Sequence, residues 1–432
     1  MLKKKKIIYV PMGADIIHSG HINVINQAKK YGKIVIGLFT DSAIAEYKSL
    51  PLINYEQRFE IIKNFKGIIK IMKQDTWDYT KNLKKLKPDF LIHGDDWREG
   101  IQKNMRNKVI KTLKLWGGKL IEVPYTKKAS TSKIHEKVKN IYFNTESRVS
   151  RLQRLLQSKK IVRILEAHNS LTGLIIENLK LTKNQKFLEF DGMWSSSLTD
   201  SAIRGKPDNQ SVDYSTRISG LNEILDVTNK PVIFDADNGG RIEHLPYLIR
   251  GLERAGVSAI VIEDKIGLKK NSLFKNQTGV KQDSVKNFCR KLKKARESKL
   301  SSDLLIVARI ESLILGKSMN DAIKRAEAYS KAGADAILIH SKKKNSREIF
   351  SFAKRFVKSK YYKPMVAVPS TYSKIYEKDL AKNGFRIVIY ANHLLRAAYP
   401  AMVEVAKKIL VNQRSFDVEK KISSIDEVIN LI

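Results

Sequence analysis

The sequence has 432 residues but only one cysteine, Cys289, and no run of about 18 apolar residues. One cysteine excludes an internal disulfide framework and fits a reducing cytoplasm, where we expect the protein to act. Without a long apolar run, the sequence predicts no membrane span. Four lysines precede the first apolar stretch, as in a signal peptide. That stretch is short, however, and Gly13 and Asp15 follow where a cleavage site would lie, which favours a first β-strand.

Acidic residues are also scarce relative to basic ones, because 44 Asp and Glu stand against 81 Lys and Arg, a formal charge of +37. Such a surface would suit nucleic acid, since binding releases counterions. The sequence has no arginine-rich stripe with interleaved aromatic residues, and lysines scattered over solvated helix faces explain the charge more simply. We therefore expect no nucleic-acid partner, and a nucleic-acid-binding protein with a decayed enzyme fold is the alternative. A positive field also steers nucleotides and phosphate esters.

The length predicts two domains. In the first ~135 residues, short β-branched runs alternate with amphipathic helical patterns, which predicts a parallel, Rossmann-like sheet covered by helices. The five predicted strands are residues 5–11, 33–39, 68–72, 89–94 and 119–125. The stretch 136–150 is polar and basic, so we place the boundary there and predict domains at 1–140 and 141–432.

The second part repeats the alternation over more units. Six strand-like runs are each followed by a helical pattern, at residues 231–237, 259–264, 304–310, 336–341, 365–370 and 386–392. Polar or charged residues end several of these runs. Because a (β/α)₈ barrel builds its site at the carboxyl ends of its strands, the pattern predicts an α/β protein whose C-terminal domain is a (β/α)₈ barrel with a catalytic site.

Four of these strand ends carry chemistry. Asp235 and Asp237 are two residues apart and point the same way, and Glu263 ends the next strand. Three carboxylates at neighbouring strand ends suit Mg²⁺, a hard ion that prefers oxygen. Arg309 and His340 end two further strands, and they suit an anionic, phosphorylated substrate.

From about residue 155 to the end, the chain resembles phosphoenolpyruvate mutase of the isocitrate lyase superfamily. The matching motifs keep the same order and cover nearly the whole domain. They are EAHNSLTG from Glu166, GMWSSSL at 192–198, GKPDN at 205–209, DADNG at 235–239, EDKIGLKKNSL at 263–273, VARIES at 307–312 and ANHLLRA at 391–397.

The resemblance implies roles for individual residues. Asp235, Asp237 and Glu263 would hold Mg²⁺. The pyruvate end of the substrate would lie against Trp194, Ser196, Ser197 and Leu198, and Arg309 and His340 would bind phosphoryl or bridging oxygens. Asp208 would lie near the phosphorus, as nucleophile or as electrostatic partner of a metaphosphate-like group. Lys269, Asn271 and Ser272 would belong to a gating loop that keeps water from the migrating group.

Other chemistries of the superfamily are weighed on the same residues. The C–C lyases carry a catalytic cysteine in a KKCGH-type loop, whereas this chain has KKNS at 269–272. Phosphonopyruvate hydrolase is closer and is the alternative, although Asn271 favours a mutase. Ser197 departs from the pattern, because mutases usually have glycine there. Mutases are homo-oligomers, commonly tetramers built from dimers that exchange a helix, so we expect a dimer or tetramer.

The N-terminal part has its own motif. His18 and His21 lie three residues apart at the start of a helical pattern and share one face. A helix N-terminus favours phosphate, imidazoles stabilise charge that develops on a phosphorus, and Gly20 admits a nucleotide close to the backbone. Four letters alone are a weak signal, and a structural histidine pair would be the default.

Residues ~5–135 resemble the HxGH nucleotidyltransferases of the cytidylyltransferase type. The resemblance implies nucleotide-binding roles, with Mg²⁺ accompanying the triphosphate, for Gly13, Asp15, Gly20, Lys48, Arg58, Gly94, Asp95, Asp96, Ser130, Thr131 and Ser132. His18 and His21 would be catalytic. CTP is favoured over ATP. Family members use phosphate-ester acceptors, but fusion to a mutase favours a phosphonate such as 2-aminoethylphosphonate. The hypothesis is a bifunctional enzyme of phosphonate biosynthesis that takes phosphoenolpyruvate or phosphonopyruvate at one site and CTP at the other.

Overall fold

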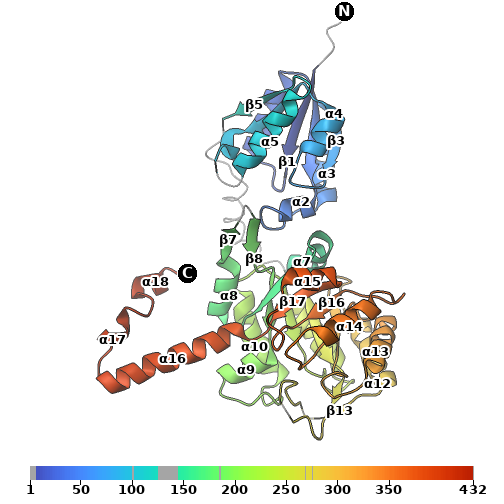
Figure 1. The fold of residues 1–432 in the computed structure, drawn as a ribbon, viewed down its shortest axis with the longest axis vertical. Coiled ribbons are helices and arrows are strands. Elements are labelled where there is room, and N and C mark those ends of the chain that lie inside the picture. Colours follow the sequence, from blue (N-terminus) through green and yellow to red (C-terminus); the bar gives the residue numbers. More distant parts are fainter. Residues whose placement is uncertain are drawn as a thin grey trace, which may run out of the picture. The chain divides into compact units, whose positions relative to one another are not determined.

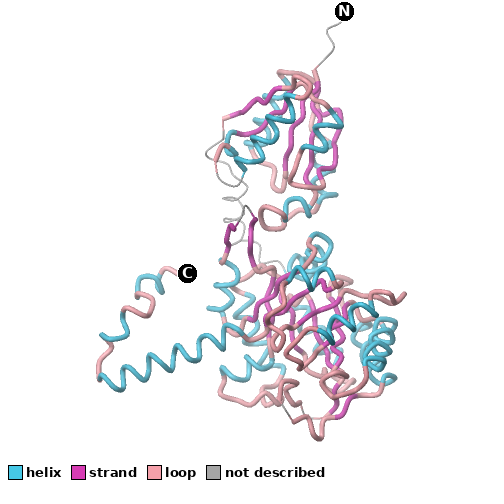
Figure 2. Tube along the Cα trace, viewed as in Figure 1, coloured by secondary structure: helices cyan, strands magenta, loops and turns pink. Residues whose placement is uncertain are grey.

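The computed structural model describes residues 6–99, 102–124, 145–183, 186–267, 269–274 and 276–431. The chain divides into two compact units (Figures 1 and 2). The first comprises residues 1–142, 157–159 and 180–189, and the second comprises 143–156, 160–179 and 190–432. Each unit is described by itself.

The first unit is built on a parallel sheet. Its strands are β1 (Ile7–Met12), β2 (Lys33–Phe39), β3 (Ile68–Gln74), β4 (Phe90–Gly94) and β5 (Lys119–Val123), so all five predicted strands are present. Its helices are α1 (Ser19–Lys29), α2 (Asp41–Ala45), α3 (Tyr55–Lys63), α4 (Thr80–Leu86), the 3₁₀ turn η1 (Asp95–Trp97) and α5 (Lys103–Lys114). A short hairpin, β7 (Lys180–Lys183) with β8 (Lys186–Glu189), is grouped with this unit.

The strand order is β3-β2-β1-β4-β5, with every neighbouring pair parallel. The central strand β1 is buried on both faces, because Ile8 and Val10 belong to one apolar cluster and Tyr9 belongs to the other. The chain leaves β1 toward β2 and later returns to pair β4 with β1. Strand order therefore reverses between β1 and β4, which is where an open α/β sheet places its ligand crevice.

The second unit is a closed barrel of eight parallel strands in the order β10-β11-β14-β15-β16-β17-β6-β9. The predicted (β/α)₈ architecture is confirmed. The strands are β6 (Val162–Glu166), β9 (Gly192–Ser195), β10 (Val232–Asp235), β11 (Ala259–Glu263), β14 (Leu305–Ile310), β15 (Ala336–Ile339), β16 (Met365–Ala367) and β17 (Phe385–Tyr390).

Helices follow the barrel strands in turn. They are α8 (Ser170–Asn178), α9 (Ser197–Ile203), α10 (Tyr214–Leu225), α11 (Leu245–Ala255), α12 (Val285–Glu297), α13 (Met319–Ala332), α14 (Arg347–Phe356), α15 (Glu377–Lys382) and α16 (His393–Asn412), with α7 (Thr145–Ser158) preceding β6. A pair of antiparallel two-residue strands, β12 (Lys265–Ile266) and β13 (Lys281–Gln282), lies between β11 and α12 in the chain.

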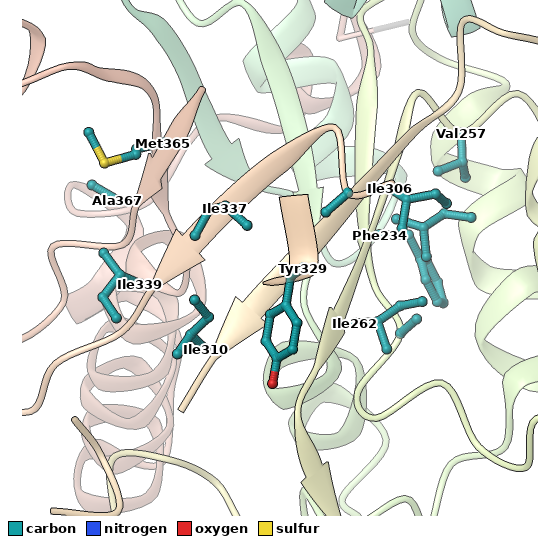
Figure 3. Packing of buried hydrophobic residues seen from close by; sticks show 14 of the residues in the cluster. Phe234, Val257, Ile262, Ile306, Ile310, Tyr329, Ile337, Ile339, Met365 and Ala367 are labelled. Atoms are coloured by element: carbon teal, nitrogen blue, oxygen red, sulfur yellow. The ribbon is translucent and has the colours of Figure 1, made fainter. Parts of the chain in front are cut away.

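Side chains on each barrel strand alternate between two environments. One set packs against the helices in the main apolar cluster, as Ile262, Ile310 and Ile339 do (Figure 3). The alternate set faces the barrel interior, since successive side chains of a strand point to opposite sides. Counting from Ile262 and Ile310, the neighbours Glu263 and Arg309 fall in the interior set. The period of two therefore aims charged strand ends at the barrel axis.

Local sequence signals fix where the covering helices begin and end. The side chains of Asp213, Ser284 and Ser318 accept hydrogen bonds from the first turns of α10, α12 and α13. Gly256 and Gly333 end α11 and α13 with φ of 98° and 111°, which a residue with a Cβ rarely adopts.

The C-terminal arm consists of α16, α17 (Phe416–Glu419) and α18 (Ile425–Ile429). No residue of α16 is buried, and Figure 1 shows this helix extending away from the barrel. Large apolar side chains lie exposed along the arm, among them Leu410, Val411 and Ile425. Within the described ranges, no helix is both long enough and apolar enough to cross a membrane.

Candidate functional sites

A small cavity of about 50 Å³ lies at the carboxyl end of the barrel strands. Residues predicted from five separate stretches of the sequence line it together: Trp194, Ser196, Ser197, Leu198, Asp235, Lys269, Asn271, Ser272, Arg309 and His340. The volume accommodates only a few water molecules. The covering segment, described at residues 266–267, 269–274 and 276–282, contributes Lys269, Asn271 and Ser272 to this lining.

Three buried carboxylates form the floor of this site. Asp235, Asp237 and Glu263 are 5%, 3% and 2% exposed. Asp237 adopts a left-handed conformation with φ of 50°, which is costly for a residue with a side chain. Two backbone contacts hold it there, because its N–H donates to Asp235 Oδ1 at 3.1 Å and its carbonyl accepts from the Glu263 N–H at 2.8 Å. Local strain is thus retained where the carboxylates converge.

Arg217, on α10, compensates part of this negative charge. The guanidinium is 1% exposed, donates from Nη1 to the Asp235 carbonyl at 2.6 Å and lies 3.6 Å from Asp237 Oδ2. Its Nε donates to Asp200 Oδ2 at 3.0 Å. Arg217 lies in the first turn of α10 outside any motif and was not predicted, and only its buried position shows that it serves the site.

The Lys269 ammonium lies among the carboxylates. Its Nζ is 2.8 Å from Asp208 Oδ1, and it also contacts Asp237 and the Ser197 hydroxyl. Burial alone would lower the pKa of Lys269, but Asp235, Asp237 and Asp208 raise it above the ordinary value. Burial likewise raises the pKa of Asp237 more than Lys269 lowers it, whereas for Asp235 the nearby cations outweigh burial and the pKa is lowered.

A second charged cluster surrounds Glu311, which is fully buried. Glu311 accepts from Arg309 Nε at 2.6 Å and from the Ser272 hydroxyl at 2.5 Å. The Lys265 ammonium lies 3.4 Å from Glu311 Oε2, the same oxygen that accepts from Ser272. Arg309 also lies 3.0 Å from His340 Nδ1 through Nη2. Because arginine only donates, Nδ1 accepts and the neutral ring carries its proton on Nε2.

Burial and the Arg309 charge lower the pKa of His340, so the ring is neutral near pH 7. Glu311 stands two residues after Arg309, the same spacing as Asp235 and Asp237. Only Arg309 was predicted from this strand. The two-residue spacing was the signal that could also have identified Glu311.

The covering segment is closed over the site. Asn271 Nδ2 donates to Asp208 Oδ2 at 2.7 Å, and Ser272 also accepts from Arg309 at 2.8 Å. The base of the segment is tied down by Asp264, whose carboxylate accepts from Gln282 at 2.8 Å and from the Glu311 N–H at 2.9 Å. Burial raises the pKa of Asp264 to about 6, despite these hydrogen bonds.

The crevice of the first unit begins at the end of β1. Ala14 takes a left-handed conformation with φ of 52°, and the chain then enters α1 through His18, its N-cap. His18 Nδ1 accepts from the Gly20 N–H at 3.1 Å, and His21 Nδ1 accepts from the His18 N–H at 3.4 Å. The two ring centroids are 4.1 Å apart. When neutral, both rings therefore carry their proton on Nε2.

Lys48 and Arg58, both predicted to bind the nucleotide, differ in how deeply they are buried. Lys48 is partly buried, and burial lowers its pKa while Asp15 opposes that shift. Arg58 is fully buried. It donates to the carbonyls of Gly13 at 2.5 Å and of Phe39 at 2.8 Å, so it positions the loop after β1. Its other contacts are the Ile53 carbonyl and Asp41.

The second part of the candidate site is the loop after β4, the strand that pairs with β1 on the side opposite β2. Gly94 ends β4, and Asp95 and Asp96 form the η1 turn with the buried Trp97. Trp97 stacks on His93 with centroids 3.9 Å apart, and its indole donates to Glu122 at 2.9 Å. Strand pairing of β1 with β4 brings this turn to the same sheet edge as α1. The predicted residues Ser130, Thr131 and Ser132 lie outside the described residues.

Comparison with known proteins confirms both family resemblances. Residues 152–410 match the family described as phosphoenolpyruvate phosphomutase, and residues 14–137 match the cytidylyltransferase-like family. A phosphoenolpyruvate phosphomutase from Tetrahymena pyriformis is 34% identical over 67% of this chain and 93% of its own length.

The chain belongs to the phosphoenolpyruvate phosphomutase family.

Three further matches are to a hydrolase sequence and to two crystal structures. A phosphonopyruvate hydrolase from Variovorax sp. (strain Pal2) is also 34% identical, over 65% of this chain and 93% of its own. The crystal structure of a phosphoenolpyruvate phosphomutase from Streptomyces platensis subsp. rosaceus matches with a TM-score of 0.61 and 33% identity, over 66% and 94% of the two chains. A hydrolase crystallised with oxalate and Mg²⁺ matches with a TM-score of 0.59, 32% identity and coverage of 66% and 94%.

The mutase-family site was tested for its fit to a divalent cation. In the described part of the chain, no three His, Cys, Asp or Glu groups are spaced to hold a metal ion as they stand. Asp208 Oδ1 and Asp237 Oδ1 are nevertheless buried with the Lys269 ammonium against them, and Glu263 Oε2 is buried 3.5 Å from Arg309 Nη2. These hard oxygen donors fit Mg²⁺ once the Lys269 ammonium withdraws.

Glu311→Gln tests the second charged cluster. The amide keeps the shape of the side chain but removes the charge that balances Arg309 and Lys265. Losing one partner of a buried ion pair leaves the other uncompensated, so we expect the free energy of unfolding of the barrel to fall by about 3 kcal/mol or more. Denaturant unfolding, monitored by the hydrogen exchange of barrel peptides, measures this free energy of unfolding. The exposed Glu297→Gln is the control, and an equal effect of both changes would contradict the assignment.

The histidines of α1 give a pH prediction. Burial, His18 and Lys48 lower the pKa of His21 from 6.5 to about 4. The unfolded chain therefore takes up this proton first, and the stability that neutral His21 contributes is present above pH 6.5 and lost as the pH falls toward about 4. NMR titration of the imidazole Cε1–H, assigned with His21→Gln, should give this low midpoint. A midpoint near the ordinary value would contradict it.

Proposed function

We propose that the barrel interconverts phosphoenolpyruvate and phosphonopyruvate. The observation that carries the proposal is the closure of the covering segment, which brings Lys269 and Asn271 onto Asp208 above a cavity of about 50 Å³. A phosphoryl group that migrates within one molecule must be kept from water. A site that shuts this tightly over an acidic residue suits that requirement.

The reaction is an isomerisation, so no other reactant takes part. The bond between phosphorus and the enol oxygen breaks, a bond between phosphorus and the methylene carbon forms, and the oxygen left behind becomes the keto group. The protein chiefly positions and neutralises charge in such a loose transfer. Arg309 supplies a permanent positive charge, and the neutral His340 offers an Nε2–H to a phosphoryl or bridging oxygen. Asp208 acts as nucleophile or as electrostatic partner of the phosphorus.

Mg²⁺ is the proposed cofactor of this site. Asp235, Asp237 and Glu263 would hold it directly or through water, and when bound it would neutralise charge that develops on substrate oxygens. Trp194, Ser196, Ser197 and Leu198 line the cavity where the pyruvate end of the substrate would lie.

A phosphonopyruvate hydrolase is the second candidate, and the equal identity to a relative of that name keeps it open. The hydrogen bond from Asn271 to Asp208 favours the mutase, because it occupies one oxygen of a carboxylate that could otherwise orient an attacking water. The products separate the two, since a hydrolase gives pyruvate and phosphate.

We further propose that the first unit transfers CMP from CTP to a phosphonate acceptor and releases pyrophosphate. The Nε2–H groups of His18 and His21, at the N-terminus of α1, would donate to the phosphate under attack. Lys48 would contact the triphosphate, with Mg²⁺ as its counterion. The turn at Asp95 and Asp96 would contact the base and the acceptor. A phosphonate such as 2-aminoethylphosphonate is the proposed acceptor because both domains share one chain, and a phosphate ester is the alternative.

The two-site account predicts separable losses. Asp237→Ala should abolish turnover of phosphonopyruvate, by at least about a hundredfold, and leave pyrophosphate release from CTP intact, because each site acts on its own substrate. His21→Ala should do the reverse. ³¹P NMR of the purified chain, first with phosphonopyruvate and Mg²⁺ and then with CTP and a panel of phosphonates and phosphate esters, follows both. Loss of both activities in a single folded variant would contradict the account.

We also propose a homo-oligomer, a dimer or a tetramer, in which the C-terminal arm packs on another copy. Leu410, Val411 and Ile425 are 78%, 79% and 78% exposed, and soluble chains rarely leave so many large apolar side chains in water. Replacing Leu410 and Val411 together by Lys should lower the mass measured by sedimentation equilibrium, whereas Lys407→Glu on the same helix should not. A wild-type monomer would contradict the proposal.

A further inference from the structure

The Ser197 hydroxyl joins the covering segment to the carboxylate floor. Ser197 is the first residue of α9 and is 4% exposed. Its Oγ lies 2.9 Å from Asp235 Oδ2 and also contacts Lys269 Nζ. An ammonium can only donate and a carboxylate can only accept. The hydroxyl must therefore accept from Lys269 and give its own proton to Asp235, so the direction of both hydrogen bonds is fixed.

These two hydrogen bonds act in the same sense. One holds the lysine among the carboxylates, where it also contacts Asp237 and Asp208. The other occupies an oxygen of Asp235 that a metal ion would use. Each therefore favours the state in which the ammonium, and not a divalent cation, neutralises the buried negative charge. A glycine at this position could make neither contact.

We propose that Ser197 and Lys269 form a latch that closes the site in the absence of a divalent cation. Mg²⁺ or Mn²⁺ displaces the Lys269 ammonium from the carboxylates and releases the covering segment, so that the ion binds before the substrate. The segment closes again once the substrate is bound, which restores the exclusion of water. The latch rests on the proposed metal dependence of the barrel but not on which isomer or product it forms. It makes Ser197 a positioning residue for cation entry.

Direct binding of Mn²⁺ alone tests the latch. Ser197→Ala removes both hydrogen bonds, so the lysine competes less well and Asp235 is released. We expect the dissociation constant of Mn²⁺, measured from the EPR signal of the free ion, to fall by about three- to tenfold, and Ser197→Gly to do the same. Ser201→Ala, a buried serine on the same helix, is the matched control and should leave it unchanged. Asp237→Ala should abolish this binding, which assigns the ion to the barrel.

Trypsin cleavage at Lys269 and Lys270 gives a second readout. It distinguishes a metal that opens the covering segment, which speeds cleavage, from one that only orders it, which slows cleavage. Without metal the latched segment of wild type should resist cleavage, and Ser197→Ala should be cut several times faster. Mn²⁺ alone should speed cleavage of wild type, whereas an ion that merely ordered the site would slow it.

The proposal is overturned if Ser197→Ala binds Mn²⁺ no more tightly than wild type, if neither protein binds it at the barrel, or if Mn²⁺ protects the wild-type segment. These readouts do not depend on turnover. A chain that shows the latch but fails to isomerise phosphonopyruvate would contradict the proposed function alone.

Discussion

The barrel site depends on the balance of charge at the carboxyl ends of its strands. Asp235, Asp237 and Glu263 are almost wholly withdrawn from water, and an isolated ionised carboxylate in such a place would cost several kcal/mol. Arg217 and Lys269 make the arrangement tenable from two directions. One cation comes from a packed helix and is permanent. The other comes from the covering segment and is removable, so the state of the segment and the charge of the site are coupled.

The same constraint organises the second cluster. Glu311 is a fully buried anion that binds Arg309, and Ser272 joins the covering segment to both residues. Asp264 then ties the base of that segment to the backbone of Glu311. The covering segment and the strand ends are thus held by one hydrogen-bonded network. A change at any member is expected to be felt by the others, because networks of this kind are not additive.

Much of this could be predicted from the sequence. The parallel sheet, the (β/α)₈ barrel and the strand ends at Asp235, Glu263 and Arg309 follow from the alternation of strands and helices and from the period of two within a strand. Strands β6 and β9 lacked that signal, since β9 has only four residues and begins with Gly192. Neither was predicted as a strand, and only the motifs EAHNSLTG and GMWSSSL of the family resemblance fall at these positions.

The supporting residues could not be predicted in the same way. Arg217 lies in the first turn of a helix, where an arginine ordinarily faces water, and only tertiary packing turns it toward Asp237. Arg58 was predicted as a nucleotide contact, whereas its hydrogen bonds show it organising the loop at Gly13. Sequence motifs identify groups that touch ligands more readily than the groups that hold those ligand contacts in place.

We propose that the Lys269 ammonium and a divalent cation occupy in turn one position among the barrel carboxylates. Crystals of the full chain soaked in Mn²⁺, with anomalous diffraction recorded for the metal, test this directly. We predict a metal peak bounded by Asp235, Asp237 and Glu263, with Lys269 Nζ moved away from Asp237 and Asp208. A peak at that position with Lys269 still bound to both carboxylates, or no peak there at all, would contradict the account.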